Sequence, residues 1–473
     1  MDSYEKFDES LKNAAEAFRN IDKKEVIRLI SHLDADGISA ASIMIKLLNN
    51  DNRKYSVSII QQLNKEVLMQ VSSEPYNCII FTDIGSGVIE EMQQILKGKQ
   101  VFILDHHEID GYAENKDIVL VNPHIFGIDG GKEISGAGVV FKFACAVDKS
   151  MEEIAHIAIV GAMGDMQERN GFLRLNNEIL NIAMEKGKIK VTTGLRIFGG
   201  QTKPLYKALE YCTDPYIPGV SGSESGAIQF LYQMGIEPKN GSGWKKIIHL
   251  DEEEMKKLVT GIIMKRLNEA NPDDVLGNIY ILPHEQEESP TRDAKEFATL
   301  LNACGRLGRA WFGIGTCLGD KKIKQQAVRS LADYKKEIVN ALNWYNENKF
   351  TDDVHWGNKF VIINAKDKVM STMIGTLASI LSKSNVMTNN TFILSMAQAI
   401  DGNTKISLRT TNNINGKLDL RNIIGEIING IGNSEAGGHQ NAAGAVIPTN
   451  KENQFVTAAK EVLGKYAVEE KIG

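Results

Sequence analysis

The chain has 473 residues, a formal net charge of −6 and 42% hydrophobic residues. This length predicts two or three domains, and the apolar content is sufficient for their cores. The negative charge argues against a surface coated with cations for duplex DNA, so any nucleic-acid function must depend on a local basic groove.

Neither export nor membrane insertion is expected. The N-terminal segment is acidic and lacks the apolar stretch of a signal peptide, and no apolar run approaches the roughly 18 residues of a membrane span. The five cysteines show no Cys-x-x-Cys spacing, which argues against a zinc knuckle or a disulfide framework. We therefore expect reduced, mostly buried thiols in a cytoplasmic protein without a membrane partner.

The N-terminal part alternates apolar runs with helical patterns. We expect strands at residues 25–31, 55–60, 77–81, 100–104 and 117–121, and a helix at residues 38–48. Such alternation predicts a parallel, doubly wound sheet. A glycine-bearing segment at residues 135–138 then opens an apolar helix, whose backbone N–H groups can face a phosphate or simply form a tight turn.

Acidic and histidine residues directly follow three of these strands. They are His32, Asp34 and Asp36 after the first, Asp83 after the third, and Asp105, His106 and His107 after the fourth. Functional groups of open α/β sheets lie beyond the carboxyl ends of the strands, so these side chains are expected to meet. Carboxylates and imidazoles suit divalent manganese, magnesium or zinc, and one carboxylate can bridge two ions. The sequence therefore predicts a two-metal site.

Taken singly, several of these residues have a plainer interpretation. A lone aspartate after a strand is most often a helix cap or a turn residue, which applies to Asp83 and to Asp165 after the apolar stretch 154–163. His156, within that stretch, is expected to pack in a helix. The combination of His-x-Asp-x-Asp-Gly with Asp-His-His is much harder to obtain by chance.

Beyond residue 165 the pattern loosens into short helices separated by glycine and proline breaks, which predicts a helical insertion and linker. A second α/β pattern follows, with strands at 360–364, 391–397 and 405–410 and helices at 372–381, 420–428 and from 452. We predict three domains, at residues 1–165, 166–345 and 346–473.

The C-terminal domain contains candidate anion-binding residues. A Gly437-Gly438-His439 turn lets the backbone approach a phosphate closely, and Arg409 offers a planar fork for bidentate recognition. An arginine in a strand is nevertheless more often a surface residue. Arg306, set among glycines, is a further basic candidate.

These motifs resemble those of a known family. His32-Leu33-Asp34-Ala35-Asp36-Gly37, Asp83, Asp105-His106-His107 and Gly164-Asp165 resemble the four motifs of the DHH phosphoesterases, and residues 437–444 resemble the glycine-rich loop of their DHHA1 domain. Residues 302–309 and the long middle region are most similar to the archaeal RecJ-like proteins, including the GINS-associated nuclease.

The resemblance implies an N-terminal parallel-sheet DHH domain, an inserted helical region and a smaller α/β DHHA1 domain. It also implies a ligand set: one ion on His32, Asp34 and Asp83, and another on Asp36, Asp83, His106 and Asp165. Two divalent ions are expected, Mn²⁺ first and Mg²⁺ as the alternative.

Further roles follow from the same resemblance. His107 would contact the phosphate or protonate the leaving oxygen, with Asp105 orienting a neighbouring imidazole. Arg409 and His439 would hold a substrate phosphate across a cleft from the metals. Two roles are considered for His124, after the fifth strand: it would either join the metal ligands or line the phosphate pocket.

The implied activity is single-strand-specific exonuclease hydrolysis of DNA, or alternatively RNA, in the 5′→3′ direction in replication or repair. Phe198, Tyr206, Tyr211, Tyr216 and Trp311 are available as stacking platforms, although aromatic residues at helical spacing are more often core. One alternative is an oligoribonuclease or cyclic-dinucleotide phosphodiesterase. Another is a replisome scaffold bound to the GINS complex, which is also the expected partner of the nuclease.

Overall fold

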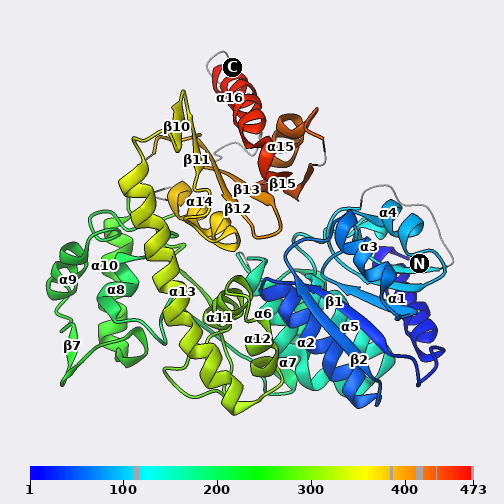
Figure 1. The fold of residues 1–473 in the computed structure, drawn as a ribbon. Helices are drawn as coiled ribbons and strands as arrows, with labels where there is room; N and C mark the ends of the chain where they lie inside the picture. The colour runs from blue at the N-terminus through cyan, green and yellow to red at the C-terminus, as the bar shows by residue number, and fades with distance from the viewer. Residues whose placement is uncertain are drawn as a thin grey trace. The chain divides into compact units, whose positions relative to one another are not determined.

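A computed structural model describes residues 1–109, 117–169, 171–269, 271–383, 387–411, 419–432 and 434–469, without the side chains of 435, 439 and 467–469 (Figure 1). The chain divides into two compact units, Met1–Leu331 and Ala332–Gly473. Within the described ranges, no helix combines the length and the apolarity needed to cross a bilayer.

The first unit contains a five-stranded sheet in the order β2-β1-β3-β4-β5, in which every strand pair is parallel. Its strands are β1 Ile27–His32, β2 Tyr55–Ile60, β3 Cys78–Thr82, β4 Gln100–Leu104 and β5 Ile118–Val121. The central strands are buried on both faces, which explains their continuous apolar runs.

Helices cover both faces of this sheet. Alternate strand residues such as Leu29 and Ile80 pack in a core with helices from one side, whereas Ile30 and Phe81 belong to a separate core on the other. The helices are α1 Ser3–Arg19, α2 Ala35–Asn50, α3 Lys65–Ser73, α4 Ile89–Ile95, α5 Gly136–Val147, α6 Ala155–Gly164 and α7 Arg174–Glu185. The sequence patterns did not anticipate α1, which begins with a capping box between Asp2 and Glu5.

The inserted region has its own apolar core and is not purely helical. It holds α8 Leu205–Glu210, α9 Glu224–Gln233 and α10 Glu252–Lys265, with the short hairpin of β7 Lys239–Asn240 and β8 Gly243–Trp244. An antiparallel ribbon of β6 Lys190–Leu195 and β9 Leu276–Ile281 flanks it. Helices α11 Ala294–Arg306, α12 Ala310–Cys317 and α13 Lys321–Asn348 follow.

The second unit is built on a six-stranded mixed sheet in the order β10-β11-β12-β13-β15-β14. Its strands are β10 Val354–Gly357, β11 Phe360–Asn364, β12 Phe392–Gln398, β13 Asn403–Thr410, β14 Glu435–His439 and β15 Ala442–Pro448. Its helices are α14 Ile374–Lys383, α15 Leu420–Ile428 and α16 Glu452–Glu469. Apolar residues of α15 and α16 form a core with the strands.

The predicted fold class is confirmed: a parallel-sheet domain, a largely helical insertion and a smaller mixed-sheet domain are all present. Besides α1 and the β6–β9 ribbon, which the sequence patterns did not anticipate, one expected element takes another form. The segment containing Gly437 and Gly438 was expected to be a turn, but it forms edge strand β14, paired antiparallel to β15. The pairing satisfies backbone groups that a turn would leave to a ligand.

Candidate metal centre

The loops that follow β1, β3 and β4 meet at one edge of the parallel sheet. Strands β1 and β3 are neighbours although β2 lies between them in sequence, so the chain reverses its strand order at this point. Ligands of doubly wound sheets bind in the crevice at such a switch point. The structure thus concentrates the histidine and aspartate side chains where the topology favours a site.

Among the described residues, three overlapping groups of potential metal ligands occur here: His32, Asp34 and Asp83; Asp36, His106 and Asp165; and Asp83 with Asp105, His106 and His107. His32, Asp34 and Asp83 offer atoms that all lie within 4.8 Å of one another. His32 Nδ1 is 2.9 Å from Asp34 Oδ2 and 3.7 Å from Asp83 Oδ2. The other Asp34 oxygen accepts the Gly37 N–H and caps α2, so this aspartate is both a helix cap and a candidate ligand.

The second group consists of Asp36, His106 and Asp165. His106 Nε2 is 3.3 Å from Asp165 Oδ2 and 3.7 Å from Asp36 Oδ2. The opposite ring nitrogen, Nδ1, is hydrogen-bonded to the Gly130 carbonyl at 2.7 Å. Because a carbonyl only accepts, Nδ1 donates to it, which leaves Nε2, facing the acidic residues, as the ring nitrogen available to a metal.

Asp83 lies between the first and second groups. Its Oδ2 faces His32, whereas its Oδ1 is 3.3 Å from His106 Nε2. The residue adopts a left-handed backbone with φ of 58°, which aspartate tolerates better than most residues. This geometry is that of a carboxylate able to bridge two ions.

Several buried ligand atoms have no hydrogen-bond partner among the described residues. They are His32 Nδ1, Asp83 Oδ1, Asp83 Oδ2 and His106 Nε2. Burying polar atoms without partners is costly, and buried carboxylates normally have a partner of opposite charge. Divalent ions supply the missing partners, so the residues present fit a pair of such ions.

Electrostatics lead to the same conclusion. Burial opposes protonation of His32, but Asp34 and Asp83 outweigh it and raise its pKa well above the usual value. Burial raises the pKa of Asp165 to about 7 and raises that of Asp36 strongly. Without a metal the cluster therefore holds protons near neutral pH, which bound ions would displace.

Asp105 positions the neighbouring histidines. Its Oδ1 accepts a hydrogen bond from His107 Nδ1 at 2.8 Å and from the His106 N–H, and its Oδ2 accepts the Ser86 N–H at 2.9 Å. Burial disfavours the charged carboxylate, but His107 outweighs this effect and lowers the pKa of Asp105. A charged Asp105 fixes the His107 ring, as expected for an orienting residue.

The start of α5 supports the centre in a way that the sequence did not reveal. The Gly136 and Ala137 N–H groups donate to the two Asp36 oxygens at 2.6 and 3.0 Å. The helix start therefore faces the centre but binds an aspartate of this chain. A Cβ at Gly136 would lie 2.3 Å from Asp83 Oδ1, so only glycine permits this approach. The contact joins distant segments, which local patterns cannot show.

The segment with Arg306 packs against the loop after β1. Asn302 Oδ1 accepts the Ala35 N–H at 3.1 Å, and a Cβ at Gly305 would lie only 1.6 Å from the Leu33 carbonyl oxygen. Arg306 ends α11 directly after this contact. The segment thus supports the metal-binding loop, and substrate binding by Arg306 stays a prediction.

His124 lies on the short 3₁₀ helix Pro123–Phe126, outside the ligand groups found among the described residues. Its Nε2 is 2.9 Å from the position that a Cβ at Gly130 would occupy. Burial lowers its pKa. His156 lies on α6 as expected and is half-buried, and desolvation lowers its pKa to about 4.

In the second unit, Arg409 and strand β14, which contains Gly437 and Gly438, both contact Ala443 of β15. Arg409 donates to the Ala443 carbonyl at 3.3 Å, to the Leu408 carbonyl at 2.8 Å and to Ser379 Oγ at 3.2 Å. Gly438 pairs with Ala443 and has a φ of 130°, which side chains rarely tolerate. Gly437 pairs with Gly444, and the His439 side chain lies outside the described residues.

Three family models match the chain in order: the DHH family N-terminal domain at residues 26–163, the DHH-CID domain at 197–279 and the DHHA1 domain at 357–465. An uncharacterized protein of Methanocaldococcus jannaschii is 33% identical over 93% of both chains. The single-stranded-DNA-specific exonuclease RecJ of Bacillus subtilis is 27% identical over 35% of this chain and 22% of its own length.

Two solved structures have similar folds. CDC45 from Entamoeba histolytica matches 98% of this chain and 99% of its own, with a TM-score of 0.63 and 12% identity. RecJ from Thermus thermophilus, solved with Mn²⁺, matches 96% of this chain and 55% of its own, with a TM-score of 0.58 and 16% identity. At these identities the likeness concerns the fold.

Proposed function

Because this chain belongs to the DHH/DHHA1 superfamily of RecJ-like proteins, we propose that it is a metal-dependent nuclease that hydrolyses phosphodiester bonds in single-stranded nucleic acid. The observation that carries the proposal is Asp83, whose two buried oxygens face two separate ligand groups without hydrogen-bond partners among the described residues. A structural carboxylate would be satisfied by donors of the protein.

Each side chain then has a distinct task. His32, Asp34 and Asp83 would hold one ion, and Asp36, Asp83, His106 and Asp165 would hold the other, with Mn²⁺ as the first candidate and Mg²⁺ as the second. When bound, the ions supply positive charge that stabilises the phosphoryl transition state and lowers the pKa of water.

The remaining residues act on the substrate. His107 has an exposed side-chain fraction of 36% at the edge of the buried cluster, so it can reach a phosphate there and donate a proton to the leaving oxygen. Asp105 accepts a hydrogen bond from its Nδ1 and raises its pKa against the opposing effect of burial, which favours the protonated ring. Arg409 supplies a planar guanidinium for a substrate phosphate, beside the Gly437–Gly438 strand.

The finer assignments are DNA as substrate, with RNA as the alternative, and digestion from the 5′ end. The first is supported by the similarity to RecJ of B. subtilis, whose name specifies single-stranded DNA, and the second is what the resemblance to RecJ-like proteins implies. The test is to incubate the protein and Mn²⁺ with single strands labelled at either end. A 5′→3′ exonuclease releases the 5′ label at once as a short product. Shortening from the 3′ end with the 5′ label retained would reverse the direction, and equal cutting of duplex would refute strand specificity.

A protein partner belongs to the same proposal. We expect docking onto the GINS replication complex through a surface away from the metal centre, either on the inserted region or on the second unit. Co-elution of the purified proteins at micromolar concentration is the expected result. No co-elution at low salt would favour an independent nuclease.

A further inference from the structure

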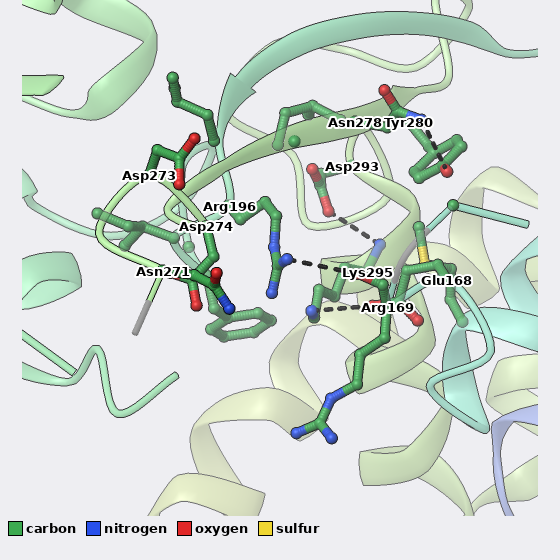
Figure 2. Close-up of a pocket in the computed structure, with 18 residues that line it drawn as sticks. Glu168, Arg169, Arg196, Asn271, Asp273, Asp274, Asn278, Tyr280, Asp293 and Lys295 are labelled. Carbon is green, nitrogen blue, oxygen red and sulfur yellow. Dashed lines mark hydrogen bonds and ion pairs between the residues drawn. The ribbon is translucent and has the colours of Figure 1, made fainter. Parts of the chain in front are cut away.

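A cavity of about 530 Å³ lies where the inserted region joins the parallel-sheet domain (Figure 2). Met163, Glu168 and Arg169 line it from the end of α6 and the following turn, and Arg196 and Phe198 line it from the inserted region. This volume is within the range of small-molecule sites and suits one nucleotide.

The cavity lies close to the metal centre. Met163 precedes the candidate ligand Asp165 by two residues, and Glu168 follows it by three. Consecutive Cα atoms are 3.8 Å apart, so the Cα atoms of both lining residues are within about 11 Å of the Cα of Asp165. A nucleotide next to the scissile phosphate is of the right size to span that interval.

The polar lining matches a nucleotide. Figure 2 shows the Arg196 guanidinium pointing into the cavity, next to the Arg169 carbonyl that it contacts at 3.4 Å. Lys295 bonds one oxygen of Glu168 at 2.9 Å, while the other oxygen is buried without a partner among the described residues. Lys295 and Arg169 are paired with Glu168 and Asp214, and the lining also contains Asp273, Asp274 and Asp293, so Arg196 is the cation left to face a phosphate. The second Glu168 oxygen is an acceptor for a sugar hydroxyl or a base amino group.

A row of alternating aromatic and lysine side chains leads from the cavity across the inserted region. Lys203 Nζ is 4.7 Å from the centre of the Phe198 ring and 5.0 Å from that of Tyr211. Lys207 Nζ is 5.4 Å from the ring centres of both Tyr211 and Tyr206. Phe198 belongs to the cavity lining, so the row begins inside the cavity.

The row continues to the hairpin of the inserted region. The Tyr206 and Trp244 rings are 4.5 Å apart, and Lys239 lies 5.4 Å from the Trp244 ring. Tyr211 and Trp244 are 56% and 41% exposed, although burying them would have been favourable for folding. Lys207 is not a free cation, because it also bonds Glu210 and Glu224.

We propose that this aromatic row, with its lysines, binds the single strand that leaves the metal centre through Phe198, Tyr211 and Trp244, while Tyr206, 9% exposed, supports these rings from the core. The cavity would hold the nucleotide nearest the cleavage point. Single-strand binders combine basic side chains for the backbone with aromatic faces for the bases, and such stacking tolerates any sequence. The inference rests on the proposed nuclease function and assigns the inserted region a part in it.

The test measures binding separately from hydrolysis. Fluorescence anisotropy with a labelled oligo(dT) of about 15 nucleotides, long enough to cover one such surface, gives the dissociation constant of the full chain. An Asp83→Asn background with Mn²⁺ present prevents turnover during the measurement. Tyr211→Ala and Trp244→Ala should each weaken binding by about 5- to 150-fold, the range for loss of one stacked base.

Tyr232→Ala is the matched control, because Tyr232 lies in the same region and is 58% exposed but is outside the row. It should change binding less than twofold. Equal effects of Tyr211→Ala and Tyr232→Ala would overturn the proposal, as would no binding of the oligonucleotide by the parent protein. Displacement by polyglutamate as effective as by oligonucleotide would also overturn it, since it would indicate a general anion surface.

Failure of the two proposals can be told apart. If the wild-type chain hydrolyses single strands but the row variants bind normally, the row is not the strand path and the nuclease function stands. If the row variants lose binding but the wild-type chain hydrolyses no nucleic acid, the row stands and the nuclease function fails.

Discussion

The metal centre and the Arg409 region are both polar, but they differ in whether their polar side chains have hydrogen-bond partners within the protein. In the metal centre, both oxygens of Asp83 are buried without hydrogen-bond partners among the described residues. Arg409 donates to a serine hydroxyl and two backbone carbonyls. The first region is complete only with cations, whereas the second is held in place by its own unit. We therefore expect substitutions in the metal centre to abolish activity, and substitutions in the Arg409 region to lower it by degrees.

The largest effect should come from Asp83→Asn. Asparagine tolerates the left-handed backbone at this position but loses the charge needed to bridge two ions. Initial rates on single-stranded DNA with Mn²⁺ should fall at least about 10³-fold, on the scale of losing a principal charge-stabilising group. Asp8→Ala, an exposed aspartate on α1, is the control and should retain activity. Near wild-type rates for Asp83→Asn would remove the distinction between the two regions.

Gly136→Ala tests the centre without removing a ligand. The added methyl group would lie 2.3 Å from Asp83 Oδ1 and must displace it, and a shift of about 1 Å can cost 10²-fold in rate. We expect kcat to fall by about that factor. Gly425→Ala, in helix α15, meets no atom within 4 Å and is the matched control. Because alanine favours helices, a loss of activity with an unchanged or higher Tm would locate the effect at Asp83.

Arg409→Lys should have a smaller effect, because it keeps the charge and removes only the planar fork. Loss of charge-assisted hydrogen bonds to a phosphate should lower kcat/KM by about 10- to 100-fold. Steady-state kinetics check this, and the Mn²⁺ content of the variant should equal that of wild type. A fall in Mn²⁺ content would show that the second unit contributes to the metal centre itself.

The smallest effect is a pH dependence of stability. The pKa values of Asp165, Asp36, His32 and His106 are all raised in the folded state, so their contribution to stability is lost as pH rises through those values. Asp165 has a pKa raised from its usual 3.8 to about 7, so the metal-free protein should lose stability progressively between about pH 4 and pH 7.

Bound Mn²⁺ replaces the lost protons, so the gain in Tm from Mn²⁺ should increase by several degrees over the same pH interval. Thermal scans with Mn²⁺ and with EDTA measure this gain. A gain that shrinks with rising pH would contradict the assignment. No comparable Mn²⁺-linked change is expected from the Arg409 region.

The parallel sheet and the convergence of its loops could be predicted because buried strands read as continuous apolar runs, with polar residues directly after them. His32, Asp83 and His106 were expected near one another for this reason. The β6–β9 ribbon was not predictable, since it pairs Lys190 with Ile281 across the whole insertion. The Gly136 contact with Asp83 is equally non-local. Gly437 and Gly438 suggested a turn, but pairing with β15 overrides that local preference.

The most direct test of the account is the number of ions that the metal centre binds. Equilibrium dialysis of the full chain against Mn²⁺, followed by elemental analysis, should find two ions per wild-type chain and fewer in Asp83→Asn, because both ions would share that carboxylate. A wild-type chain that binds no Mn²⁺, or a variant that binds as many ions as wild type, would contradict the two-metal centre.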